Sequence, residues 1–265
     1  MDSDARIHIA TLRESHDRLA GLAGPLTPEQ VREQSYDSDW SNAQLLSHLG
    51  SGAELSLLRL PAAFGEGEPP GPEGNQAVWD IWNAKSPDDQ AADAIESDER
   101  YVASLEGLSD EQLAAIRLDF LGMQLDAAGM VRLRLGEHAL HTWDLAVTQD
   151  PAATVQQSAV ELLIDNVPAF LAPRLGKPLG EPFAVRITAT DPARDYLLTA
   201  DEAVRVANWP GDMSEAEADV VPHVTMPAEA LLRLSYGRLD PEHTPSSVSG
   251  DAEVLEKLRR IFPGF

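Results

Sequence analysis

Apolar residues recur at a helical spacing through most of the first 150 residues. This spacing gathers them on one face of a helix, and that face is then buried against a neighbouring element. Ser41 and Ser109 stand where helix N-caps belong, and Thr27-Pro28 begins a short helical turn. Residues 64–75, rich in Gly and Pro, are predicted to be loop. The predicted long helices cover residues 4–23, 41–63, 88–105 and 126–148.

The pattern changes after Pro182. Apolar residues then alternate with polar ones, as in half-buried strands. The predicted strands cover residues 182–191, 196–201, 203–209 and 218–226, and the helices that follow cover 226–239 and 250–262. A helix over 154–171 connects the two halves. The fold class is therefore α+β, with a four-helix bundle over 1–150, a bridging helix and linker over 151–180, and a small α+β domain over 181–265.

The stretch GEHALHTWDLA, residues 136–146, breaks the apolar pattern of its helix. Leu133, Glu137, His141 and Leu145 follow one another four residues apart, so a carboxylate and an imidazole share one otherwise apolar stripe. Burying polar groups is costly unless they are paired. Two ligand-type side chains one turn apart could chelate a divalent metal ion such as zinc. An intrahelical Glu–His pair is the alternative interpretation.

A third metal ligand would have to come from another helix. His48 lies among leucines in LLSHLGS, and His16 lies on the apolar stripe of the first helix as its rival. A lone buried histidine can also be a hydrogen-bonded core residue that binds no metal. The remaining histidines of the chain outside the stretch 136–146 lie in polar or second-half contexts; they are His8, His223 and His243.

Two further polar residues of the stretch need partners. His138 points about 100° away from Glu137 around the helix, which predicts that it packs outward or caps a neighbour. Asp144, nearly one turn after His141, could orient the ring by accepting a hydrogen bond from its free nitrogen. Otherwise it is an exposed acid.

Composition narrows the possible functions. The 265 residues carry 44 acidic and 20 basic side chains, a formal charge of −24, which disfavours nucleic acid or an anionic membrane as partner. The chain has no cysteine, so it supplies no disulfide, zinc–thiolate site or thiol nucleophile. The first residues lack a signal pattern and no apolar run is long enough to span a bilayer, so a cytoplasmic location is the expectation.

These residues resemble the mycothiol-dependent maleylpyruvate isomerase family, a branch of the DinB-like metal-binding bundles. The resemblance rests on two groups of residues, Trp40-Ser41 with Leu45, Leu46, His48 and Leu49, and Glu137-x-x-x-His141-Thr142-Trp143-Asp144-Leu145-Ala146. It implies that His48, Glu137 and His141 bind zinc or another divalent metal. The second half resembles the small sterol-carrier-like domain of the family, which donates an arginine to the active site. Arg238 in Tyr236-Gly237-Arg238 is the matching position, although it could be an ordinary arginine after a helix-ending glycine.

The resemblance also implies a chemistry. Mycothiol would be the thiol cosubstrate, and its thiolate would add to a small electrophile, giving either cis–trans isomerisation or S-transfer. Two alternatives remain open, a zinc-dependent hydrolase that uses metal-bound water and a non-enzymatic module that binds a metal or an apolar ligand. The sequence does not encode the electrophile, the choice between isomerase and transferase, the identity of the metal, or the oligomeric state.

Overall fold

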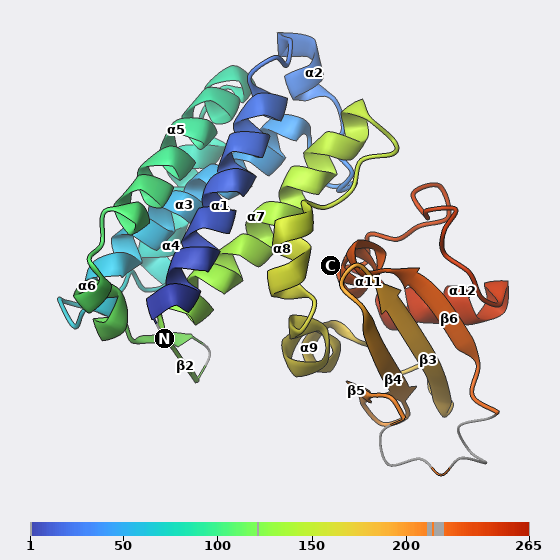
Figure 1. Cartoon of the computed structure of the whole chain (residues 1–265). Helices are drawn as coiled ribbons and strands as arrows, with labels where there is room; N and C mark the ends of the chain where they lie inside the picture. Colours follow the sequence, from blue (N-terminus) through green and yellow to red (C-terminus); the bar gives the residue numbers. More distant parts are fainter. Residues whose placement is uncertain (1, 121, 211–213, 215–219, 265) are drawn as a thin grey trace. The chain divides into compact units, whose positions relative to one another are not determined.

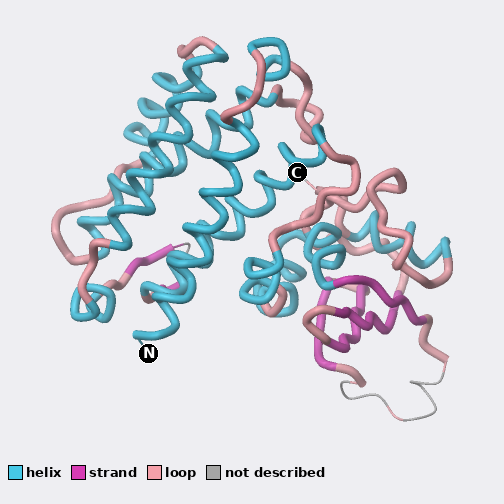
Figure 2. The backbone as a smooth tube through the Cα atoms, turned by 45° about the horizontal axis from the view of Figure 1, so that its top comes forward, coloured by secondary structure: helices cyan, strands magenta, loops and turns pink. Residues whose placement is uncertain are grey.

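The computed structural model describes residues 2–120, 122–210, 214 and 220–264. The chain divides into two compact units, Met1–Ala153 and Thr154–Phe265. The first unit is helical and the second contains a sheet (Figures 1 and 2). The predicted α+β fold class, with a helical first half and an α+β second half, is confirmed.

Four long helices form the first unit, and each contacts two of the others. α3 contacts α5 and α7, and α1 likewise contacts α5 and α7. Shorter elements complete the unit. The helices of this unit are α1 (Asp2–Ala23), α2 (Pro28–Arg32), α3 (Asn42–Ala63), α4 (Pro72–Asn83), α5 (Pro87–Glu106), α6 (Asp110–Ala115) and α7 (Ala127–Gln149). The strands β1 (Leu118–Phe120) and β2 (Met123–Leu125) pair as a small antiparallel hairpin.

The helices begin where the sequence places their caps. The Ser41 side chain accepts a hydrogen bond from the Gln44 backbone N–H and caps α3, and Ser109 caps α6 in the same way. Asp126 caps α7 by accepting from the backbone N–H of Gly129. Each cap satisfies a backbone donor that the first turn of a helix leaves unpaired.

Two elements were missed by the sequence analysis. The prediction of loop up to residue 75 is wrong at its end, because α4 begins at Pro72. Proline is well tolerated in the first turn of a helix, since the N–H it lacks would have no partner there, so Gly71-Pro72 is a start signal as much as a breaker. The hairpin of β1 and β2 is too short to show a clear strand pattern.

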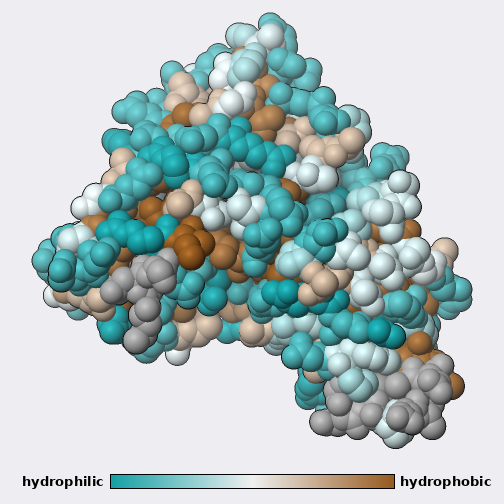
Figure 3. Space-filling view, in the orientation of Figure 1, coloured by the Kyte–Doolittle hydropathy of each residue, from teal (hydrophilic) through white to brown (hydrophobic). Residues whose placement is uncertain are grey.

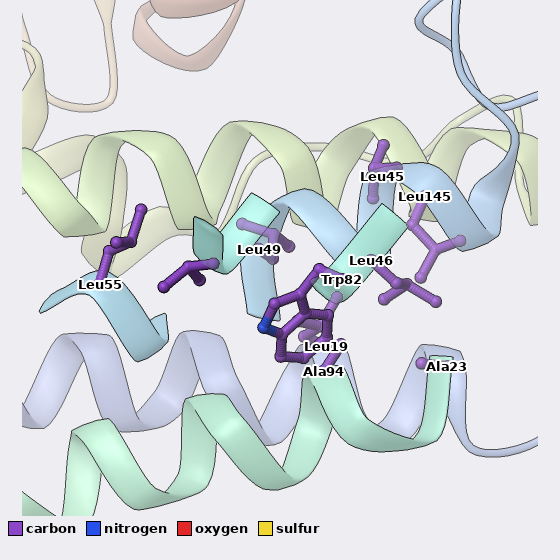
Figure 4. Close-up of a cluster of buried hydrophobic side chains, with 10 residues drawn as sticks. Leu19, Ala23, Leu45, Leu46, Leu49, Leu55, Trp82, Ala94 and Leu145 are labelled. Atoms are coloured by element: carbon purple, nitrogen blue, oxygen red, sulfur yellow. The ribbon is translucent and has the colours of Figure 1, made fainter. Parts of the chain in front are cut away.

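The apolar core of the first unit gathers around Trp82 of α4 (Figure 4). Its indole lies among leucines of α1 and α3, and its Nε1 donates a hydrogen bond to Glu54 Oε2 over 2.7 Å. Gly50 of α3 makes room for this ring. A Cβ at Gly50 would lie 2.4 Å from Trp82 Cη2 and 2.7 Å from the Cα of Ala94 in α5. The close approach of α3 and α5 therefore depends on a residue without a side chain.

The second unit is built on a four-stranded sheet in the order β5-β4-β3-β6. β3 pairs antiparallel with β4 and parallel with β6, while β4 and β5 are antiparallel. Buried residues alternate along β3, as the sequence predicted. α11 packs on β3 and β6. The elements of this unit are α8 (Gln157–Leu163), the π-helix η1 (Val167–Leu171), α9 (Ala172–Leu175), β3 (Phe183–Thr190), β4 (Arg194–Ala200), β5 (Val204–Asn208), β6 (His223–Pro227), α11 (Ala228–Ser235) and α12 (Ala252–Ile261).

Two predicted segments of this unit differ from the structure. The continuous helix expected over 154–171 is interrupted, because α8 ends at Leu163 and η1 begins only at Val167, next to Pro168, which has no N–H to donate. The strand expected over 218–226 corresponds to β6, which begins at His223. Residues 218 and 219 of that prediction lie outside the described part of the chain.

The Gly50→Ala variant should be less stable than the wild type by roughly 1–3 kcal/mol, because the added methyl group overpacks the contact with Trp82 and Ala94. Urea denaturation followed by circular dichroism measures the change. Gly21→Ala is the matched control, since no atom lies within 4 Å of a Cβ at that helical position. That variant should gain about 0.5–1 kcal/mol. Equal effects of the two substitutions would show that the α3–α5 contact is not close-packed.

Candidate metal centre

Helices α3 and α7 bring three ligand-type side chains together. His48 comes from α3, and Glu137 and His141 come from α7. Glu137 Oε2 lies 3.5 Å from His48 Nε2 and 3.8 Å from His141 Nε2. One ligand atom from each of the three residues lies within 4.8 Å of the others. This group, the His48–Glu137–His141 triad, contains the three residues that the resemblance implied.

The spacing of these atoms suits a divalent cation. Ligand atoms bonded to zinc at about 2.1 Å in a tetrahedron lie about 3.4 Å apart. The distances in the triad are close to that value. Two imidazole nitrogens and one carboxylate oxygen form a donor set that zinc and neighbouring divalent ions accept. The residues therefore fit a metal with little rearrangement.

Asp144 fixes the orientation of His141. Its Oδ2 lies 2.8 Å from His141 Nδ1, and the carboxylate is fully buried. Asp144 was expected either to accept a hydrogen bond from His141 or to be an exposed acid, and the structure has the first arrangement. With Nδ1 engaged, Nε2 of His141 is the nitrogen that faces Glu137. A carboxylate behind a ligating histidine holds its ring and strengthens its basicity.

Trp40 packs against both histidines of the triad. Its ring centroid lies 4.9 Å from that of His48 and 5.8 Å from that of His141, and the two imidazoles are 4.8 Å apart, edge to face. In the sequence, Trp40 was noted only as part of the family resemblance, with no contact predicted for it. Its position one residue before the N-cap Ser41 explains the contact, because the first turns of α3 lead directly to His48.

Glu137 is ionised at neutral pH. Desolvation opposes its ionisation, but the interactions with His48 and with His141 outweigh that effect and lower its pKa to about 2. The side chain is half exposed. A carboxylate that is already charged can bind a cation without first losing a proton.

Two residues of the triad, His48 and Glu137, line a cavity of about 260 Å³ within the first unit. Most of the lining is apolar, and burial raises the pKa of Tyr101 in its wall to about 12, so this hydroxyl is protonated at neutral pH. The lining residues are His48, Gly52, Leu55, Ser56, Arg59, Trp79, Tyr101, Leu118, Met130, Leu133, Arg134 and Glu137.

A second polar cluster lies inside the same unit. Asp98 of α5, with no exposed surface, has Oδ2 2.8 Å from His138 Nε2 and 2.9 Å from His16 Nδ1. Its Oδ1 accepts a hydrogen bond from Arg134 Nη2 over 2.8 Å. The other ring nitrogen of His138 lies 2.8 Å from the hydroxyl of Ser15. We call these five residues the Asp98 cluster.

The Asp98 cluster corrects two expectations. His138 was expected to pack outward or to cap a neighbour, but it is fully buried, because α7 contacts other helices on several sides. His16, the rival third ligand, lies with Asp98, and its Nε2 is 3.0 Å from Glu99 Oε2. It is not among the grouped ligand atoms of the triad. Asp98 gave no signal in the sequence because it is one of many acids on α5.

Arg238 follows α11 in the second unit. α11 ends at Ser235, and Gly237 has a φ of +74°, the left-handed conformation that ends many helices. The Arg238 side chain is buried, and its Nη1 donates to the Tyr236 carbonyl over 3.0 Å. Nη1 of Arg233 donates to the Arg238 carbonyl over 3.2 Å. These contacts fix the loop that carries Arg238.

Two family models match the chain. The one described as the mycothiol maleylpyruvate isomerase N-terminal domain matches residues 12–146, and the one described as the MDMPI C-terminal domain matches residues 159–257. The chain belongs to the mycothiol-dependent maleylpyruvate isomerase family. This confirms the family resemblance found in the sequence. The first match includes the whole triad and the second includes Arg238.

Solved structures of this family have the same fold. A crystal structure of the mycothiol-dependent maleylpyruvate isomerase superposes with a TM-score of 0.64 at 14% identity, over 93% of this chain and 92% of the other. The crystal structure of a histidine-to-alanine mutant of that isomerase gives 0.62 at 14% identity, over 88% and 89%. The curated proteins gave no match. Among the described residues, no helix is both long and apolar enough to cross a membrane.

Replacing Asp98 with Asn should destabilise the protein by about 3–5 kcal/mol at neutral pH, because it removes the charge that compensates the buried Arg134. Burial opposes ionisation of Asp98, but His138, His16 and Arg134 hold its pKa well below the usual range. The stability that ionised Asp98 contributes is therefore fully present above the ordinary carboxyl pKa of about 4. It is lost as the pH falls through the lower pKa that Asp98 has in the folded protein.

Urea denaturation of wild type and variant at pH 7, 5 and 3 measures this dependence. The difference in unfolding free energy should be full at pH 7 and 5 and smaller at pH 3. Glu96→Gln, an exposed carboxylate of the same helix, serves as control and should change stability little at any of the three values. An Asp98→Asn variant as stable as wild type at pH 7 would contradict the assigned role.

Proposed function

We propose that the protein is a divalent-metal-dependent enzyme, with zinc as the first candidate, that uses mycothiol to isomerise a small electrophile or to transfer sulfur to it. The observation that carries the proposal is the triad of His48, Glu137 and His141, two of whose members line a cavity, in a chain of the mycothiol-dependent maleylpyruvate isomerase family. Family membership supports an isomerase, and the triad supports its dependence on metal.

The residues of the triad would hold the cation. A bound divalent ion lowers the pKa of a coordinated thiol, so that the thiol is present as thiolate at neutral pH. Glu137 would contribute one negative charge, and Asp144 and Trp40 would keep the His141 ring in place. The chain has no cysteine, so the thiol has to come from a small molecule. Three protein ligands are the usual number for a catalytic zinc, which keeps a further position for an exogenous ligand.

The proposed reaction balances without an oxidant or reductant. The thiol sulfur forms a bond to one carbon of an electron-poor double bond, whose electron pair moves toward the activating carbonyl. Rotation then occurs about the resulting single bond. When the pair returns, the carbon–sulfur bond breaks and the isomerised alkene leaves with the thiol regenerated. If the enolate instead takes up a proton, equivalent to the one that the thiol lost, the adduct is released and the same first step gives S-transfer.

Arg238 is proposed to bind a carboxylate of the substrate. A guanidinium offers a planar pair of donors that matches a carboxylate, and its charge persists at neutral pH. The contacts that Arg233 and Tyr236 make with Arg238 support a defined position for it within the second unit.

The hydrolase alternative has less support. A hydrolase would need a general base beside metal-bound water. Among the described residues that line the cavity, Glu137 is the only carboxylate, and the proposal uses it as a ligand. A non-enzymatic module with a structural metal would need a fourth protein ligand, and the group of ligand-type side chains found in the described part of the chain has three members.

The purified protein, stripped of metal and dialysed against zinc, should bind one equivalent, measured by elemental analysis. His48→Ala and Glu137→Ala should lose stoichiometric binding, because each removes one of three ligands. Asp144→Asn should keep the stoichiometry and weaken affinity about ten- to hundredfold, since it disturbs only the orientation of His141. His223→Ala, which removes an exposed histidine of β6, is the matched control. Zinc binding that is unchanged in His48→Ala would refute the triad as the metal site.

Turnover of maleylpyruvate should require mycothiol. Chromatographic separation of the cis and trans isomers measures the rate of this turnover. Arg238→Ala should lower kcat/KM by about ten- to a thousandfold if a charge-assisted pair to the substrate is lost. Arg205→Ala, an exposed arginine of β5, is the control. Equal rates with and without mycothiol would reject thiol catalysis, and full activity of Arg238→Ala would remove that residue from the mechanism.

A further inference from the structure

Arg59 lies on the same face of α3 as the metal ligand candidate His48. His48, Gly52, Ser56 and Arg59 are spaced four, four and three residues apart, which places them on one stripe of the helix. All four residues line the cavity of the first unit. The cavity therefore has the triad toward one end of this stripe and a guanidinium toward the other.

Within the described ranges, no carboxylate pairs with the charge of Arg59. Its Nη2 donates to Asn75 Oδ1 over 3.0 Å, and no ion pair to it is found among the described residues. The other guanidinium in the cavity wall, that of Arg134, differs in this respect, because Asp98 compensates it. In a chain with 44 acidic and 20 basic side chains, a partly buried arginine without an acidic partner is unexpected.

Arg59 is also partly dehydrated. Desolvation lowers its pKa from the usual value, so the fold bears an electrostatic cost at this position. Leu55, Leu118 and Leu133 are among the apolar side chains that line the same cavity. A cation in such a wall gains more from an anion than an exposed arginine does, because water screens the attraction less.

Arg59 follows His48 by eleven positions on α3, so their Cα atoms are about 16 Å apart along the helix axis. Both side chains line the same cavity, so a ligand in it would meet the guanidinium and the triad at different levels of the helix.

We propose that Arg59 binds the carboxylate of the electrophile, which then lies along α3 with its reactive carbon toward the triad. The proposal rests on the function proposed above and adds to it a residue of the helical unit that recognises the substrate. Asn75 of α4 positions the guanidinium through its amide oxygen.

Calorimetric titration of the zinc-loaded full-length protein with succinate tests the assignment, with succinamide as the uncharged probe of the same length. Wild type should bind succinate and not succinamide. Arg59→Gln should weaken succinate binding about ten- to hundredfold, because a charge-assisted contact is lost. Arg59→Lys should retain part of the affinity for succinate, since lysine keeps the positive charge but lacks the planar pair of guanidinium donors. Arg100→Gln, an exposed arginine of α5, is the matched control and should bind as wild type does.

Three results would overturn the proposal. Succinate that binds Arg59→Gln normally but no longer binds His48→Ala would show that the metal alone takes the carboxylate. If Arg238→Ala loses succinate binding while Arg59→Gln binds succinate as wild type does, the carboxylate is assigned to Arg238. Absence of succinate binding to wild type would reject Arg59 as a carboxylate site.

The titration needs neither mycothiol nor turnover, so its failure is distinguishable from failure of the proposed function. A protein without mycothiol-dependent activity can still show Arg59-dependent binding of succinate. In an active protein, Arg59→Gln should raise KM for maleylpyruvate at least tenfold with a smaller effect on kcat, because the contact is remote from the reacting carbon.

Discussion

Helix α7 carries polar side chains on more than one buried face, and each of them has to find a partner on a neighbouring helix or on α7 itself. Glu137 meets His48 of α3, and His138 meets Asp98 of α5. These contacts fix the rotation and the register of α7 against its neighbours. The triad is therefore a consequence of how the helices are aligned. Both the buried contacts of Asp98 and the apolar core drawn in Figure 4 hold that alignment.

The sequence predicted the elements that have local signals. Ser41 and Ser109, predicted as N-caps, mark helix starts correctly, because capping depends on residues only a few positions apart. The helical period placed Glu137 and His141 on one face of their helix, but it did not identify the helix that this face meets. The family resemblance supplied His48 as the third member, and the assignment of all three as metal ligands stays a prediction.

Features that depend on contacts across helices were not predictable. Asp98 is one acid among many on α5, and only the fold shows that it is the buried one. His138 was placed on the outside because the sequence gives its angle from Glu137 but not which neighbours surround α7. The cavity and the position of Arg59 in its wall likewise arise from packing. Most of the surface seen in Figure 3 is hydrophilic, in keeping with the large negative charge, and gives no comparable pointer to a site.

Gly237 has a consequence for protein engineering within the second unit. A Cβ at this position would lie 2.4 Å from the backbone of Gly264, so the segment at residues 263 and 264 is wedged directly under the turn that precedes Arg238. A bulky substitution or an insertion at residues 263 and 264 would push on this turn and displace the Arg238 backbone without touching its side chain. Alterations made for purification are therefore better placed away from this segment.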